Sequence, residues 1–113
     1  AQAFNNYAYS LVERNEQFKK ALELAKKAID LEPENPSYLD TIGWIYFKLN
    51  NVKKARQFIE ASIKITGDNA VVLEHLGDIF MKNKKPDKAL NFYKRALNLD
   101  KNNERLIKKV ASN

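Results

Sequence analysis

Apolar residues recur at helical spacing along this chain, and short polar segments interrupt the recurrence. Between positions 39 and 49 they fall three and four residues apart, as on one face of an α-helix. Asn50-Asn51 breaks the pattern, and a second amphipathic stretch follows at 54–65. Gly67 comes just after this stretch, where a glycine commonly ends a helix. The pattern predicts two helices joined by a turn.

The same pair of helices recurs 34 residues further on. Residues 39–46 and 73–80 share their apolar, glycine and aromatic positions, and another copy lies upstream. The first half of the upstream copy fits only with one extra residue in the turn around Asn15-Glu16, because turns tolerate insertions better than helix interfaces do. Equivalent residues in the second halves of the three copies are Ala21, Leu24 and Ala28; Ala55, Phe58 and Ser62; and Ala89, Phe92 and Ala96.

We expect one all-α domain over 1–113 with repeats at about 1–35, 36–69 and 70–103, each an antiparallel pair of helices. A terminal helix is predicted at 104–111, because its apolar residues repeat the first-helix pattern. It either closes the end of the stack or begins a fourth repeat. Its polar face consists of Arg105, Lys108 and Lys109.

Small residues recur where the two helices of each copy should meet. Each copy carries a glycine or alanine in its first helix and an alanine in its second, and close backbones leave no room for larger side chains. The expected facing pairs are Ala8 with Ala21, Gly43 with Ala55, and Gly77 with Ala89. These residues are assigned to the helix interface and carry no functional prediction.

These residues resemble the tetratricopeptide repeat, a 34-residue helix pair with small residues at its eighth, twentieth and twenty-seventh positions and a proline near its end. Pro33 matches that proline, while Gly67 and Lys101 replace it in the later copies. The resemblance covers nearly the whole chain. It implies a right-handed superhelical solenoid, with a concave and a convex face, that binds a protein or peptide.

By the same resemblance, the first helices line the concave groove. Trp44 and Phe47 then form part of an apolar strip that anchors a partner, although Trp44 would equally fit between neighbouring first helices. Acidic side chains in the groove favour a partner with apolar and basic residues, or are ordinary exposed acids. The implied groove residues are Asn5, Tyr9, Val12, Asp40, Trp44, Phe47, Glu74, Asp78 and Met81.

Some family members hold a C-terminal carboxylate with Lys, Arg and Asn side chains in the groove. The required cations are missing from the matching positions of this chain, so we do not expect that mode of binding. These positions are Asn5, Tyr9, Thr41, Val71 and His75. Alternatives to partner binding are a structural end segment of a longer repeat array and a self-association surface.

The net charge of +6 comes from 20 Lys and Arg against 14 Asp and Glu. The lysines are spread along the chain as pairs, which is typical of solvated helix faces. Nucleic-acid binding is therefore the less favoured class, because it needs positive charge gathered where the ligand lies. No apolar run approaches the roughly 20 residues of a membrane helix, and composition leaves the compartment undetermined. Abundant Asn and Lys are typical of an AT-rich, bacterial genome.

The sequence lacks the residue patterns of an enzyme or a metal protein. It has no Cys, and His75 is its single histidine, with only Glu74 or Asp78 nearby as a second ligand. No glycine-rich phosphate loop and no nucleophile–base pairing suited to this fold occurs. We therefore expect no catalytic residue, no metal and no cofactor.

Overall fold

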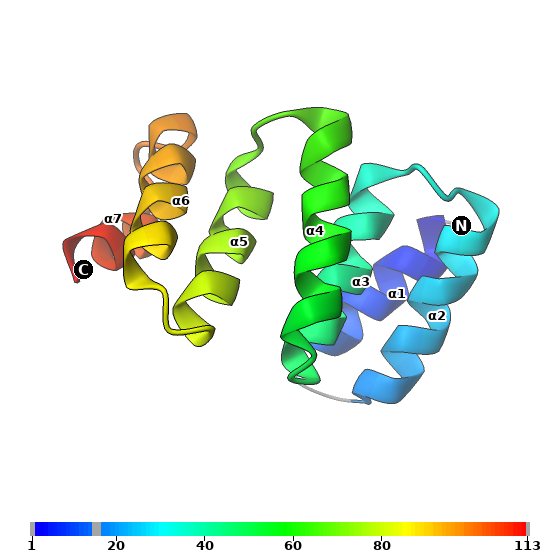
Figure 1. Cartoon of the computed structure of the whole chain (residues 1–113). Helices are drawn as coiled ribbons and strands as arrows, with labels where there is room; N and C mark the ends of the chain where they lie inside the picture. The colour runs from blue at the N-terminus through cyan, green and yellow to red at the C-terminus, as the bar shows by residue number, and fades with distance from the viewer. Residues whose placement is uncertain (1, 15–16, 113) are drawn as a thin grey trace. The chain divides into compact units, whose positions relative to one another are not determined.

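The computed structural model describes residues 2–14 and 17–112, and this part of the chain contains helices and no strand. The prediction of an all-helical fold is confirmed. The extra residue expected around Asn15-Glu16 lies outside the described residues. The helices are α1 (Gln2–Glu13), α2 (Phe18–Leu31), α3 (Pro36–Lys48), α4 (Val52–Thr66), α5 (Ala70–Lys82), α6 (Pro86–Leu99) and α7 (Glu104–Ala111) (Figure 1).

The chain divides into two compact units between Ile65 and Thr66. The first unit contains α1 to α4, and the second contains α5 to α7. Each unit has its own buried apolar residues.

An asparagine caps the first helix of each later copy. The side chain of Asn35 accepts hydrogen bonds from the backbone N–H groups at 37 and 38, and that of Asn69 from those at 71 and 72. Asn103 does the same for the N–H of Leu106 in α7. These bonds satisfy N–H groups that have no partner inside the helix. Pro86 begins α6, where its missing N–H costs little.

In the first unit, α3 and α4 form an antiparallel pair. The rings of Tyr46 and Phe58 stack with centroids 5.7 Å apart, and the Ser62 hydroxyl donates to the Pro36 carbonyl at 2.8 Å. Residue numbers therefore rise along one helix as they fall along the other. The hydroxyl bond also explains why a buried serine is tolerated at a position that is alanine in the other copies.

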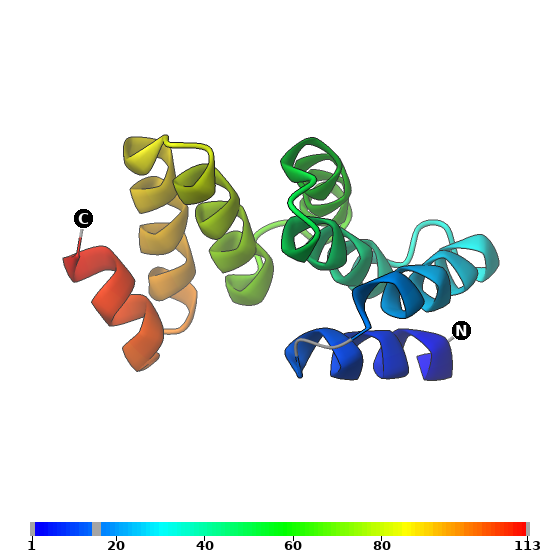
Figure 2. The same cartoon turned by 90° about the horizontal axis from the view of Figure 1, so that it is seen from below.

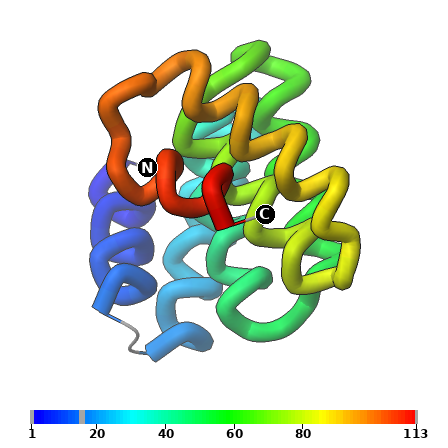
Figure 3. Tube along the Cα trace, turned by 90° about the vertical axis from the view of Figure 1, so that its left-hand side faces the viewer, coloured from blue at the N-terminus to red at the C-terminus, as the bar shows by residue number. Residues whose placement is uncertain are grey.

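The second unit repeats this arrangement at the same register. Phe80 and Phe92 stack with centroids 5.3 Å apart, 34 residues on from the pair in the first unit. α7 then packs against α6 (Figure 2). Its Leu106 is buried in the core. In Figure 3, α7 (red) lies beside the last turns of α6 (orange).

The glycines of the first helices lie where the paired helix comes closest. A Cβ on Gly43 would meet the Ile59 side chain and would lie 3.1 Å from the Ala55 carbonyl oxygen. At Gly77 the nearest atoms belong to the ring of Tyr93, which follows Ala89 by one turn on α6, as Ile59 follows Ala55 on α4. A large side chain of the second helix fills the space that each glycine leaves. Gly67 instead follows α4 with a φ of +75°, as expected of a helix-ending glycine.

Replacing Gly43 with Leu should therefore destabilise the first unit. The new side chain must displace Ile59 and push back the backbone of α4. Overpacking of this kind costs about 1–3 kcal/mol. Leucine has a higher helix propensity than glycine, but that gain is only about 1 kcal/mol. The free energy of unfolding, measured by urea denaturation and circular dichroism, checks this. The control is Ser37→Leu, on an exposed position of the same helix, which should change stability little. Equal stability of the Gly43 variant and the wild type would contradict the close contact.

Candidate protein-binding surface

Trp44 and Phe47 of α3 form an aromatic platform in the first unit. They are one helical turn apart, and their rings stack with centroids 4.7 Å apart and planes inclined by 12°. Both side chains are half-buried. The Lys48 ammonium lies 5.1 Å from the centre of the Trp44 ring. The platform is thus a pair of stacked, partly exposed rings with a cation over one of them.

On α1, the three predicted groove residues differ in exposure. Tyr9 is 36% exposed, whereas Val12 is 1% exposed. Val12 belongs to the core because it shares one face of α1 with Ala8 and Leu11, so its side chain is not available to a partner. Asn5 is also buried, and its Oδ1 has no hydrogen-bond partner among the described residues. α1 contacts α3, so Tyr9 lies on the helix next to the platform.

The acidic residues predicted for the groove are largely buried. Asp40 is 8% exposed and Glu74 is 5% exposed. Asp78 is half-buried, and Met81 is exposed on the same helix, α5. Glu74 and Asp78 are one turn apart and are called the acidic pair below. The structure brings these two carboxylates together through a shared cation.

Two basic residues of α7 hold the acidic pair. Arg105 donates from Nε to Glu74 Oε2 at 2.6 Å and from its terminal nitrogen to Oε1 at 2.8 Å, a bidentate contact. Lys109 Nζ lies 2.7 Å from Glu74 Oε2 and 3.0 Å from Asp78 Oδ1. The Tyr93 hydroxyl of α6 donates to Asp78 Oδ1 at 2.6 Å. Three helices of the second unit therefore meet at one charged cluster.

The cluster shifts the pKa values of its members. Burial favours the neutral form of Glu74, but the hydrogen bonds and positive charges of Arg105 and Lys109 outweigh it and lower the pKa of Glu74 from 4.5 to about 2. Burial and the bond to Asp78 raise the pKa of Tyr93 well above 10.0. The bond to Glu74 raises the pKa of Arg105. Glu74 is therefore ionised and Tyr93 neutral at physiological pH.

Sequence reasoning assigned Arg105 and Lys109 to the solvated face of a closing helix and did not connect them with Glu74 or Asp78. One signal was available. Arg105 and Lys109 are four residues apart, as are Glu74 and Asp78, so two neighbouring helices would place both pairs at matching heights. The predicted acidic character of this part of the surface is reduced, because cations of the chain itself already bind the carboxylates.

Many lysines lie over aromatic rings rather than together in one basic patch. Ammonium groups lie between 5.1 and 5.8 Å from the centres of six rings. The lysines concerned are Lys20, Lys27, Lys48, Lys54, Lys88 and Lys109. The hydrocarbon stems of the exposed lysines cover apolar surface while their charge stays in water. The Lys109 ammonium is instead bound by the acidic pair.

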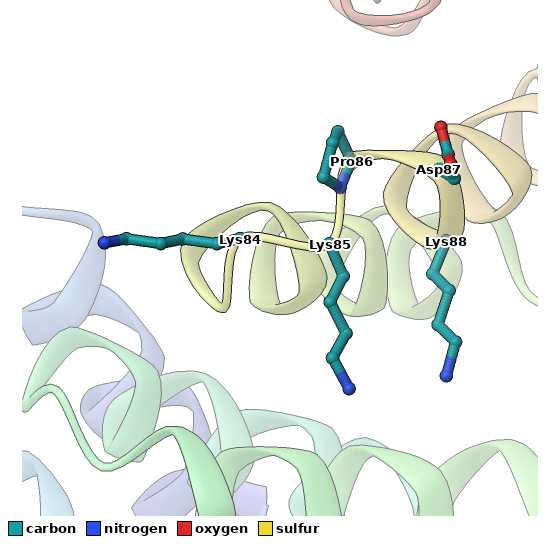
Figure 4. Close-up of a pocket in the computed structure, with 5 residues that line it drawn as sticks. All are labelled: Lys84, Lys85, Pro86, Asp87 and Lys88. Atoms are coloured by element: carbon teal, nitrogen blue, oxygen red, sulfur yellow. The ribbon is translucent and has the colours of Figure 1, made fainter.

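A shallow pocket of about 320 Å³ lies at the turn between α5 and α6. It is lined by Lys84, Lys85, Pro86, Asp87 and Lys88. Figure 4 shows the Lys84 side chain extending away from those of Lys85 and Lys88. The three ammonium groups do not converge on one point, as they would around a bound phosphate.

Two searches of the described residues bear on other classes of function. No group of three or more His, Cys, Asp or Glu side chains there is placed to hold a metal ion. Within 2–14 and 17–112, no helix has both the length and the apolar character needed to cross a bilayer.

Comparison with known proteins now places the chain. Family models described as "Tetratricopeptide repeat" match residues 14–79 and 70–103. The chain belongs to the tetratricopeptide repeat family. Members of this family are generally non-enzymatic modules for protein interaction.

Relatives extend this comparison. A TPR repeat-containing protein of Pseudomonas aeruginosa is 40% identical over 48 residues, which are 42% of this chain and 8% of the relative, so the match covers a small part of that protein's length. The first TPR domain of Spaghetti (RPAP3), solved bound to the HSP90 peptide SRMEEVD, has a TM-score of 0.87 at 17% identity and covers 98% of this chain and 87% of its own. The Sgt2 TPR domain of Aspergillus fumigatus gives 0.86 at 17% identity, with 98% and 74% covered. At these identities the solved structures show the tetratricopeptide fold.

Replacing Glu74 with Gln should remove part of the stability of the second unit. A pKa that falls from 4.5 to about 2 on folding contributes stability that is fully present above pH 4.5 and is lost as pH falls toward 2. The expected loss at pH 6 is on the order of 2 kcal/mol, less than the full shift implies because Arg105 is partly solvated.

Urea denaturation of the wild type and of Glu74→Gln at pH 6 and pH 3 measures this effect. The wild type should lose more stability between the two pH values than the variant does. Glu60→Gln is the matched control, because its partner Arg56 and Glu60 itself are both about half exposed, and such pairs contribute under about 1 kcal/mol. The same pH dependence in wild type and Glu74→Gln would show that the cluster is not coupled to folding.

Proposed function

We propose that this chain binds a protein or peptide through the aromatic platform of α3, with an apolar side chain of the partner packed against Trp44 and Phe47. The observation that carries the proposal is the stacked, half-buried geometry of these two rings on a first helix. Large aromatic side chains held rigidly at a surface are frequent anchors of binding energy. Tyr9, on the neighbouring helix α1, extends the same apolar surface.

The expected chemistry of the partner is mainly apolar. Glu74 and Asp78 are already bound by Arg105 and Lys109, so they offer less attraction to a basic partner than bare carboxylates would. Asp40 and Asn5 are buried and contribute less than the platform does. The platform therefore supplies affinity, and charge supplies a smaller part of it.

Substituting the platform should separate binding from folding. Peptides would be selected on the intact chain from a displayed random-peptide library, and their affinities for Trp44→Ala and Phe47→Ala would be measured by fluorescence anisotropy. We expect a loss of at least about 2 kcal/mol, or roughly thirtyfold, because truncating a central aromatic anchor commonly costs this much. The free energy of unfolding, followed by circular dichroism, should fall less than it does for a fully buried residue.

The control is Leu31→Ala, which removes an exposed aliphatic side chain of α2 in the same unit and should keep its affinity. Unchanged affinity together with a large loss of stability in Trp44→Ala would mean that the platform is core, and the proposal would be wrong. Selected peptides that lack apolar residues would contradict it as well.

A further inference from the structure

α7 is joined to α5 by charge as well as packing against α6. It is 8 residues long, and Leu106 is its one buried residue. Arg105 and Lys109 of α7 make hydrogen-bonded ion pairs with the acidic pair on α5.

The corresponding four positions of the first unit carry no charged side chain. Arg105 and Lys109 correspond by repeat position to Ser37 and Thr41 of α3. The acidic pair corresponds to Asn5 and Tyr9 of α1, and α1 and α3 are in contact without any ion pair at these four positions. The Thr41 hydroxyl instead donates to the Ser37 carbonyl of its own helix at 2.9 Å. Packing of one first helix on the next therefore does not require the charges found under α7.

The geometry of the contact favours exchange. The Arg105 side chain is 62% exposed, so its pairing lies at a rim that water and salt reach. α5 and α6 also pack on one another through contacts of their own, the Phe80–Phe92 stack and the close approach of Gly77 to the Tyr93 ring. Detachment of α7 would thus uncover two carboxylates and an apolar depression without removing the contacts that join α5 to α6.

We propose that the acidic pair and the adjoining site of Leu106 form a docking site for a basic amphipathic helix, which α7 occupies as an intramolecular ligand. The partner that fits is a helix with basic residues four apart and a leucine directly after the first, as in Arg105, Leu106 and Lys109. Such a helix displaces α7 by making the same two ion pairs and filling the same apolar site. This site is separate from the platform of the proposed function.

Hydrogen exchange of the intact chain, followed by NMR, gives the first test. The α7 amides should exchange faster than those of α5, and their protection should fall when salt is raised from about 0.15 M to about 1 M, where the Debye length shrinks from about 8 Å to about 3 Å. If the α7 amides are as protected as those of α5 and insensitive to salt, α7 is a fixed part of the unit and the proposal fails.

Competition by a peptide gives the second test. The probe is a fluorescent peptide with the sequence of residues 101–113, and a version with Glu in place of Arg105 and Lys109 is its control. The intact chain should bind the probe weakly, because its own α7 competes. The variant Arg105→Ala/Lys109→Ala should bind at least about tenfold more tightly. Adding Glu74→Gln and Asp78→Asn should abolish the gain.

Binding of the control peptide with equal affinity would overturn the proposal, as would the absence of a gain in a variant whose circular dichroism shows it folded. If that variant does not fold, hydrogen exchange of the intact chain decides the question. Trp44→Ala should leave both measurements unchanged. Failure of the platform proposal would therefore not count against the docking site on α5.

Discussion

How closely two helices can approach sets the architecture of this chain. At Gly43 and Gly77 even one added carbon would collide with the paired helix. The large residues around these points then stack in register, as Tyr46 does on Phe58 and Phe80 does on Phe92. Close approach places the apolar residues of each pair within contact of one another. It also leaves the remaining face of each first helix to carry side chains that differ between copies.

Much of the fold could be predicted from the sequence, because the two helices of each pair are neighbours along the chain. The 34-residue recurrence and the small residues identify the helices and their order. The asparagine caps at 35, 69 and 103 carry the same period and would have fixed the starts of three helices. The repeat pattern does not show which side chain fills the space beside a glycine, as the Tyr93 ring does at Gly77.

The candidate site was harder to predict, because side-chain pairing joins residues far apart in sequence. Glu74 and Arg105 are 31 positions apart, and a list of charges does not show that they meet. The face of α1 posed a different problem. Val12 follows the core residue Leu11 directly, and a small rotation of the helix decides whether such a side chain faces the groove or the core. The structure has Val12 in the core. Trp44 and Phe47 were recognisable because their spacing alone places both rings on one face.

The lysines that lie over aromatic rings affect how this basic chain meets water. Each one spreads a hydrocarbon stem across a ring, so part of the apolar surface is hydrated through an ammonium group rather than left bare. The same lysine side chains therefore contribute to the net charge of +6 and cover these rings. Colloidal solubility would suffer twice from the loss of such a lysine, once through charge repulsion and once through newly uncovered aromatic surface.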